Sequence, residues 1–421
     1  MQPPRRLGLL LLGCLAVTRA SALAAQEDPA DTEHSFTLRT SIKASLLVSH
    51  APDAPLLYPE RDSITSFWRM RYEPQARFSS RVTASAAYEH RFRVYSQAAG
   101  LAGLGILPPD SPAPYRLRQL DWSILTSPGS TWRHEIDRAF VAIYSSRANV
   151  TLGRQAVGWG RGVLFGAVDL FSPFTPFEAD REWRRGVDAL RADVKLGDRS
   201  SLDLVGAFGE TIDGSAFAAR FRGYKGNVDV EVVGGWRARD VLAGVTSSAA
   251  VGDAELHGEL AVFRAPEPLP AGGLDDGRVA LKAVAGGSYM FTLGNGILVY
   301  AEYHYSGFGA SSAAEIVPLL ADPAFRERYL RGDTQILERH AVAVLASYEF
   351  TPEISLSGQW TQSPVDGSGV GAPSVTLTLS DRLSLVASFY FPWGDPPEGF
   401  LLASTYGGAA TSAFFQARIY F

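Results

Sequence analysis

The sequence predicts an all-β protein, a transmembrane antiparallel β-barrel of about 18 strands. Three observations predict it: apolar residues recur at every second position in many short segments, short turns alternate with longer loops, and the chain ends within a strand. Beyond the first 24 residues, no apolar run approaches the ~20 residues of a transmembrane helix. The predicted spanning elements are therefore strands, with short periplasmic turns and longer extracellular loops.

The N-terminus predicts export. Arg5 and Arg6 precede an apolar run at 7–17, and small residues follow at 21–24. This is the pattern of a Sec signal peptide covering 1–24. Cys14, the only cysteine, leaves lipidation there as an alternative. A short periplasmic segment at 25–35 would then lead into a barrel over 36–421.

The period-two pattern first appears where Phe36, Leu38 and Ile42 alternate with Arg39 and Lys43. The predicted strands are 36–48, 63–73, 78–94, 132–145, 148–157, 187–196, 201–208, 216–222, 227–237, 242–250, 254–264, 278–287, 297–306, 339–350, 353–361, 373–380, 383–391 and 412–421.

Connections of two kinds alternate between these segments. Gly, Pro, Asn and Asp mark tight turns at 73–76, 145–148, 197–200, 223–226, 252–253, 294–296, 351–352 and 380–382. Mostly longer loops separate them, at 49–62, 96–131, 158–186, 209–215, 238–241, 265–277, 307–338, 362–372 and 392–411. An even number of strands, about 18 with about 16 as the alternative, puts both termini on the periplasmic side.

Aromatic residues near the strand ends favour a membrane barrel over a soluble propeller or sandwich. The sequence has no repeat of blade length. Aromatic girdles at the two membrane interfaces would explain the apolar-face aromatics Trp68, Tyr72, Tyr88, Phe92, Trp236, Tyr303, Tyr305, Tyr348, Phe350, Trp360, Phe389 and Phe391.

The last strand carries Phe415, Ile419 and Phe421 on its apolar face. It resembles the closing strand of Gram-negative outer-membrane β-barrels, which implies that Phe421 is read by the barrel-assembly machinery. The expected location is the outer membrane, in contact with its lipid and lipopolysaccharide.

The interleaved residues should line the lumen, and their charges are unevenly distributed. The predicted basic residues are Arg39, Lys43, Arg69, Arg71, Arg81, Arg91, Arg93, Arg191, Lys195, Arg220, Arg222, Arg278, Lys282 and Arg418. The predicted acidic residues are Glu89, Asp193, Asp203, Asp229, Glu231, Glu255, Glu259, Glu302 and Glu349. The first three strands and the last would form a basic wall, opposed by an acidic patch at Asp229, Glu231, Glu255 and Glu259. Opposed walls favour passage of ions and polar solutes; internal salt bridges in a plugged barrel are the alternative.

The densest motif lies at 152–188 and predicts a structured loop that narrows the pore. Its candidate constriction residues are Trp159, Arg161, Arg181, Trp183, Arg184 and Arg185. The Gly153-Arg154-Gln155 and Trp159-Gly160 pairs, with Asp169, Phe171 and Pro173, resemble large outer-membrane channels of the porin superfamily, nearest to the eighteen-stranded alginate-export type. The resemblance implies conduction of an anionic polysaccharide, and the tryptophans would stack on sugar rings.

Other function classes are disfavoured. The sequence has no G-x-S-x-G or H-E-x-x-H motif, so no catalytic residue, cofactor or metal is expected. A net charge of −5 gives no sign of nucleic-acid binding. The predicted function is passage or export of a carbohydrate polymer with separate periplasmic partners. A general diffusion porin for small anionic or polar solutes is the alternative, and a non-conducting adhesin the third.

Overall fold

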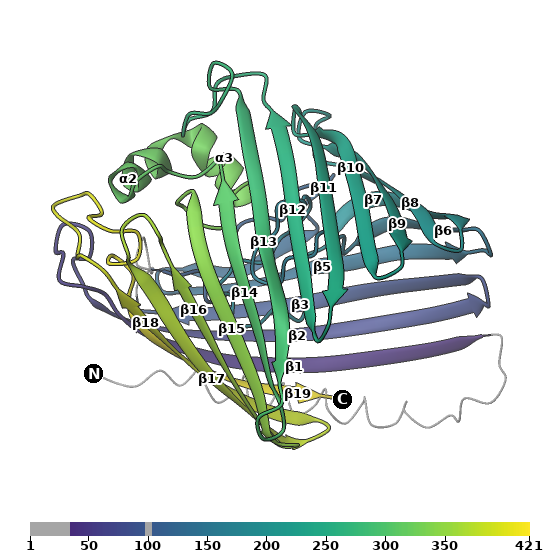
Figure 1. Ribbon diagram of the computed structural model, residues 1–421. Helices are drawn as coiled ribbons and strands as arrows, with labels where there is room; N and C mark the ends of the chain where they lie inside the picture. Colours follow the sequence, from purple (N-terminus) through teal and green to yellow (C-terminus); the bar gives the residue numbers. More distant parts are fainter. Residues whose placement is uncertain (1–33, 97–102) are drawn as a thin grey trace.

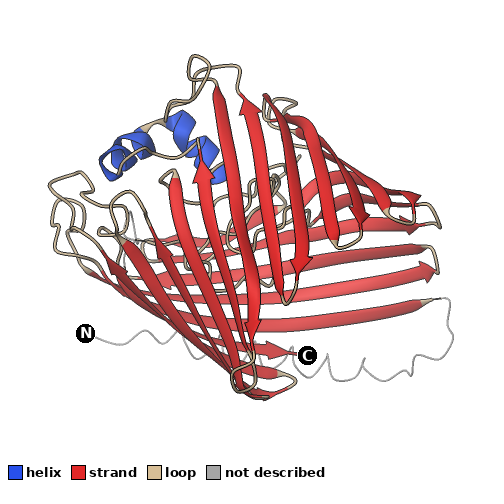
Figure 2. Ribbon diagram, in the orientation of Figure 1, coloured by secondary structure: helices blue, strands red, loops and turns tan. Residues whose placement is uncertain are grey.

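The computed structural model describes residues 34–96 and 103–421, which form one closed antiparallel barrel. Nineteen strands share a single sheet, and all but β4 span the barrel wall, so the wall has the eighteen strands that the sequence predicts. Figures 1 and 2 show long loops and two helices at one end and tight turns at the other. The predicted signal peptide, Cys14 and most of the 25–35 segment lie outside the described residues.

The elements begin and end within a few residues of most predicted segments. They are β1 (Ser35–His50), β2 (Asp62–Ser79), β3 (Val82–Tyr95), β4 (Asp121–Ser127), β5 (Ser130–Tyr144), β6 (Ala148–Gln155), β7 (Val187–Gly197), β8 (Ser200–Ala207), β9 (Ala216–Lys225), β10 (Val228–Arg237), β11 (Asp240–Val251), β12 (Ala254–Arg264), β13 (Val279–Phe291), β14 (Ile297–Ser306), α2 (Ala313–Ala321), α3 (Pro323–Arg331), β15 (His340–Thr351), β16 (Ile354–Gln362), β17 (Gly369–Ser380), β18 (Leu383–Trp393) and β19 (Thr411–Tyr420).

Pairing of β1 with β19 closes the cylinder. Leu46 lies opposite Phe415 and Ile42 opposite Ile419. Beyond the strand end, the backbone N–H of Phe421 donates to the carbonyl of Thr40 at 2.9 Å. The sheet therefore has no open edge, as a membrane barrel requires.

The outer surface is apolar, because the residues that alternate outward along the strands are left uncovered. Trp68, Val232, Phe350 and Phe389 are each more than a third exposed. Such a surface is stable only in contact with lipid, so this barrel belongs in a membrane. Of the helices in the described residues, none has the length and apolar character to cross a membrane.

Three segments differ from the sequence-based expectation. The predicted turn at 73–76 is wrong, because β2 continues through it and the turn lies at 80–81 instead. The ladder between β2 and β3 skips Glu73 and Pro74 and resumes at Gln75, so the strand tolerates a residue without an N–H.

The loops predicted at 96–131 and 307–338 contain regular structure. β4 forms a hairpin with β5 and pairs with its first half, up to Glu135. β6 pairs with the second half of β5, from Ala139 to Tyr144, along the same edge. Helix α3 begins with Asp322, whose side chain accepts from the amides of Ala324 and Phe325, and ends at Gly332 in the left-handed conformation. These caps fix a helix that is too short to show apolar periodicity. Figure 1 shows α2 and α3 at the loop end of the barrel.

Candidate constriction site in the barrel lumen

The third long loop, 156–186, folds into the barrel and is largely buried. Phe165 and Phe171 are at most 1% exposed and pack with Val205, Val233 and Phe263 on the inner faces of β8, β10 and β12. Apolar burial of this kind stabilises each side chain by about 2 kcal/mol. The loop therefore packs inside the barrel against the lumen wall.

Glu259 on β12 anchors one arc of this loop. Its carboxylate accepts from the backbone amides of Arg161, Gly162 at 2.8 Å, Ala167 at 2.6 Å and Val168 at 3.2 Å. The side chain is only 4% exposed. Charge-assisted hydrogen bonds to backbone amides are the strong kind, so this carboxylate positions the loop instead of facing a solute.

Glu302 on β14 holds the rest of the arc. It accepts from the amides of Val163 at 2.5 Å and of Leu164 and Phe165 at 3.0 Å each. His257 reaches the same carboxylate through Nε2 at 3.2 Å. The remaining amide in 161–168, that of Gly166, donates to Gln335 Oε1 at 2.7 Å. Every amide of this arc thus has a side-chain acceptor on another segment.

The rest of the predicted acidic patch is paired with arginines or histidine. Glu231 lies 3.0 Å from Arg161, 3.3 Å from Arg220 and 2.9 Å from Arg222. Asp229 also pairs with Arg161, and Glu255 lies 3.0 Å from His257 Nδ1. The patch exists, but it holds the loop and its arginine, so it is not the open negative wall that the sequence predicts.

The predicted basic wall is also rich in ion pairs. Glu89, which is fully buried, accepts from Arg69 Nε at 2.8 Å and Nη2 at 2.9 Å. Arg71 contacts the same carboxylate, and it also pairs with Glu73 at 2.5 Å and Asp137 at 2.9 Å. Buried pairs with this geometry neutralise much of the wall.

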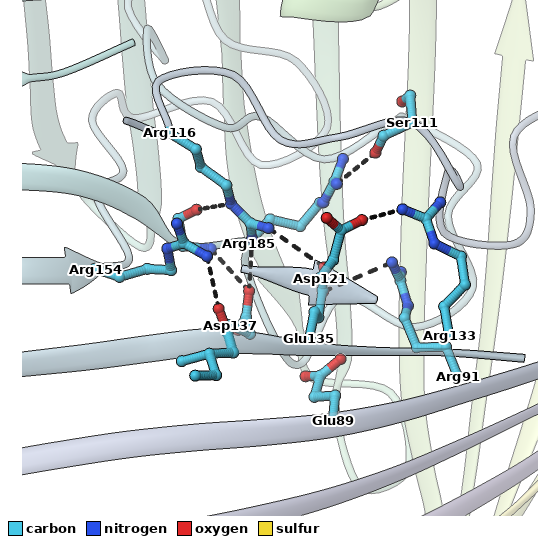
Figure 3. Close-up of polar contacts among 12 residues, drawn as sticks. Glu89, Arg91, Ser111, Arg116, Asp121, Arg133, Glu135, Asp137, Arg154 and Arg185 are labelled. Carbon is cyan, nitrogen blue, oxygen red and sulfur yellow. Dashed lines mark hydrogen bonds and ion pairs between the residues drawn. The ribbon is translucent and has the colours of Figure 1, made fainter. Parts of the chain in front are cut away.

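A second arginine–carboxylate cluster lies higher on the same wall (Figure 3). Glu135 pairs with Arg91 at 3.7 Å and with Arg116 at 3.3 Å. Arg133 pairs with Asp121 of β4, and Arg185 from the third loop donates to the carbonyl of Ser111. Glu135 and Asp137 thus supply two buried carboxylates to this cluster.

The two tryptophans of the third loop are engaged by protein groups. Trp183 lies beneath three cations, with Lys43 Nζ at 3.7 Å, Arg69 at 4.7 Å and Arg71 at 5.0 Å from its ring. Trp159 is 4% exposed and donates from Nε1 to Asp203 at 3.0 Å. Trp159 is buried, and cations of the wall already stack on Trp183, so the predicted stacking on sugar rings is not supported.

Four of the other predicted basic residues also pair with carboxylates. Lys43 contacts Asp180 at 2.7 Å and Glu182 at 2.6 Å. Further pairs are Arg93–Asp110 at 2.7 Å, Arg191–Asp203 at 2.8 Å and Arg418–Asp180 at 3.9 Å. Arg39 is exposed near the start of β1. Arg81, expected on a strand, lies in the exposed β2–β3 turn, so it does not line the lumen.

Arg181 and Arg185 differ from the other lumen arginines. Within the described residues, neither forms an ion pair with a carboxylate within 4 Å. Arg181 donates to the carbonyls of Val163 at 3.3 Å, Thr175 at 3.2 Å and Pro176. Burial lowers the pKa of both, for Arg185 to about 10, so both keep their charge at neutral pH.

Arg181 also borders a cavity of about 410 Å³ on the concave side of the loop. Gly158, Gly160 and Gly162 line it, together with Arg184 and Gln335 among others. Arg184 is paired with Asp169 at 2.6 Å, so Arg181 supplies the uncompensated charge there. The cavity has the size of a small-molecule site.

Two buried residues of this site had no role in the sequence-based interpretation. Arg116, in the second loop, donates to the carbonyl of Gly186 at 3.0 Å and pairs with Glu135 and Asp137. Arg154 on β6 holds Asp188 at 2.7 Å and the carbonyl of Ile136 at 2.8 Å. Arg154 lies within the motif at 152–188, and this position was the only sequence feature that could have identified it. No sequence feature identifies Arg116, because its loop lacks periodicity.

No protein-family model and no curated protein matches this chain. Solved structures do. OccAB1 of Acinetobacter baumannii aligns with TM-score 0.56 at 11% identity, covering 92% of this chain and 96% of that one. OccK9 (OpdG) of Pseudomonas aeruginosa gives 0.55 at 8% identity, covering 92% and 98%. A BenF-like porin of Pseudomonas fluorescens gives 0.54 at 10%, covering 92% and 98%. These similarities show the fold, and they do not show the alginate-export type.

Proposed function

We propose that this chain is a passive outer-membrane channel for small polar solutes, with a preference for anions. The observation that carries the proposal is the inward loop at 156–186, fixed by Glu259 and Glu302, in which Arg181 and Arg185 form no ion pair within 4 Å among the described residues. A positive charge in a narrow, partly dry passage concentrates anions and repels cations. The porin folds of the similar structures support the channel assignment.

Export of a carbohydrate polymer is less well supported than this alternative. The third loop occupies the lumen, and its two tryptophans are stacked or buried by protein groups. A polymer needs a continuous row of free aromatic or polar contacts. The observed cavity of about 410 Å³ suits a single small solute instead.

Planar-bilayer recording tests the proposal. In a salt gradient, the reversal potential of the wild-type channel should indicate anion preference. Replacing Arg181 or Arg185 by Gln should reduce the anion-to-cation permeability ratio by roughly two- to tenfold, because one charge about 7 Å away in partly aqueous surroundings supplies about 1 kcal/mol. Arg264→Gln, on the exposed outer end of β12, is the matched control.

The outcomes separate the candidate functions. Absence of any current would contradict the channel and favour a non-conducting adhesin. Current with cation preference, or variants indistinguishable from Arg264→Gln, would contradict the assigned role of the two arginines.

Within the same proposal, Phe415, Ile419 and Phe421 serve the barrel-assembly machinery. Refolding in lipid without that machinery should therefore be unaffected by Phe421→Ala, whereas insertion in cells should fall.

A further inference from the structure

Glu338 is a buried carboxylate in the outer loops that has no hydrogen-bond partner among the described residues. Glu338 follows α3 and precedes β15, and it is completely buried. Neither of its carboxylate oxygens has a hydrogen-bond partner among the described residues. Burial raises its pKa, and the nearby hydroxyls of Ser363 and Thr405 only partly offset that effect. An unsatisfied buried carboxylate calls for a specific explanation.

A second carboxylate, Asp366, lies close enough to raise the pKa of Glu338 further. It is rigidly held: Oδ1 accepts from Ser368 N at 2.9 Å and Ser368 Oγ at 2.6 Å, and Oδ2 accepts from Thr405 N at 2.7 Å and Thr405 Oγ1 at 2.9 Å. In the part of the chain that the structure describes, no lysine, arginine or histidine lies within 4 Å of either carboxylate. Two neighbouring anions therefore lack a protein cation.

The hydroxyl of Tyr406 provides an independent observation at the same place. It is buried, with the residue 6% exposed, and it too lacks a hydrogen-bond partner among the described residues. Burial, Glu338 and Asp366 all raise its pKa, so it remains a neutral phenol. Its oxygen can serve as a ligand, and Ser363, which is completely buried, adds a hydroxyl beside Glu338.

We infer that Glu338, Asp366 and Tyr406 form a binding site for a hard divalent cation, of which Ca²⁺ is the representative. The available donors are all oxygens, as Ca²⁺ requires, and its irregular coordination accepts hydroxyls, carbonyls and water alongside carboxylates. No group of three or more His, Cys, Asp or Glu residues gathers for a metal in the described ranges. With two carboxylates, the dissociation constant should be on the order of 0.1–1 mM, as in extracellular modules.

The bound cation would join three outer segments that are far apart in the sequence. Glu338 precedes β15, Asp366 lies between β16 and β17, and Tyr406 lies between β18 and β19. This inference goes beyond the proposed channel activity and does not depend on it. The competing explanation is a protonated Glu338 that needs no cation.

The test uses the full chain purified in detergent free of lipopolysaccharide, because lipopolysaccharide itself binds Ca²⁺. Millimolar Ca²⁺ should raise the thermal unfolding midpoint of the wild type, and a chelator should reverse the rise. Glu338→Gln should no longer respond to Ca²⁺. In chelator it should be at least as stable as the wild type, because the amide removes an uncompensated charge. Asp253→Asn, in an exposed turn, is the matched control and should respond like the wild type.

Tb³⁺ luminescence gives a second readout. Tyr406 should sensitise bound Tb³⁺, Ca²⁺ should displace it, and Tyr406→Phe should weaken the signal at least twofold. A wild-type midpoint that ignores Ca²⁺, or a Glu338→Gln variant that responds like the wild type, would overturn the site. A midpoint that rises only on acidification, and only when Glu338 is present, would show the protonated carboxylate instead.

Discussion

The wall formed by β1–β5 and the wall formed by β10–β14 both carry buried carboxylates, yet these carboxylates have different partners. On β3, Glu89 is surrounded by the guanidinium groups of Arg69 and Arg71. On β12 and β14, Glu259 and Glu302 accept from backbone amides of the third loop. The first arrangement neutralises fixed charges within the wall. The second positions a separate segment inside the lumen. The role of an acidic residue in this barrel therefore depends on which groups donate hydrogen bonds to it.

The largest expected effect comes from breaking the first arrangement. Glu89→Gln leaves two buried arginines short of a carboxylate and should lower the free energy of unfolding by about 3–5 kcal/mol. Urea unfolding of the barrel in detergent measures this. Anion preference should rise in the same variant, because net positive charge is added to the wall. Wild-type stability would contradict a structural role for Glu89.

Breaking the second arrangement should affect the current as well as stability. Glu302→Ala removes the acceptor of three loop amides and should lower the free energy of unfolding by about 2–4 kcal/mol. The released loop should give a larger, noisier single-channel current and faster trypsin cleavage after Arg161. Glu255→Ala is the control, because Glu255 contacts His257 and no loop amide. A quiet current in Glu302→Ala would show that packing and the hydrogen bonds to Glu259 hold the loop without Glu302.

The contact between the β1–β5 wall and the third loop is tested at Trp183. Trp183→Ala removes the ring beneath Lys43, Arg69 and Arg71 and should lower the free energy of unfolding by about 1–2 kcal/mol. Trp183→Phe should restore part of that loss, because the ring face remains. The midpoint of thermal unfolding measures the lost packing, and the single-channel conductance shows whether the pore has widened.

The smallest effect is expected outside the lumen. Arg264 and Asp275 lie 2.6 Å apart, but both side chains are more than half exposed. Arg264→Ala should therefore change the free energy of unfolding by about 0–1 kcal/mol, and salt should reduce even that. A larger change would mean that burial is a poor guide to the strength of ion pairs in this barrel.

The strands could be predicted from the sequence because each one repeats a local pattern with period two. Tight turns such as 197–200 carry their own residue signature, so the strand order and parity follow. β4, α2 and α3 could not be predicted, because a seven-residue strand and nine-residue helices within long loops show too little periodicity.

The site was predicted less completely than the fold. Alternation correctly places Glu259 and Glu302 on the inner face, but it says nothing about what they contact. Their partners are backbone amides about 90 to 140 residues earlier in the chain, and amides carry no sequence signature. For the same reason, Trp159 looked free to stack on a sugar although Asp203 and Arg220 enclose it.

The pairing of β1 with β19 has a consequence for assembly. Neighbouring strands such as β7 and β8 can meet as soon as both exist, but Ser45 must wait for Gln416, which follows it by 371 residues. Until then the growing sheet has two unsatisfied edges, each a template for another chain. Only a chain that includes the ten-residue strand β19 can close the barrel. A polypeptide shortened before 411 would keep both sheet edges open and remain prone to aggregation or degradation.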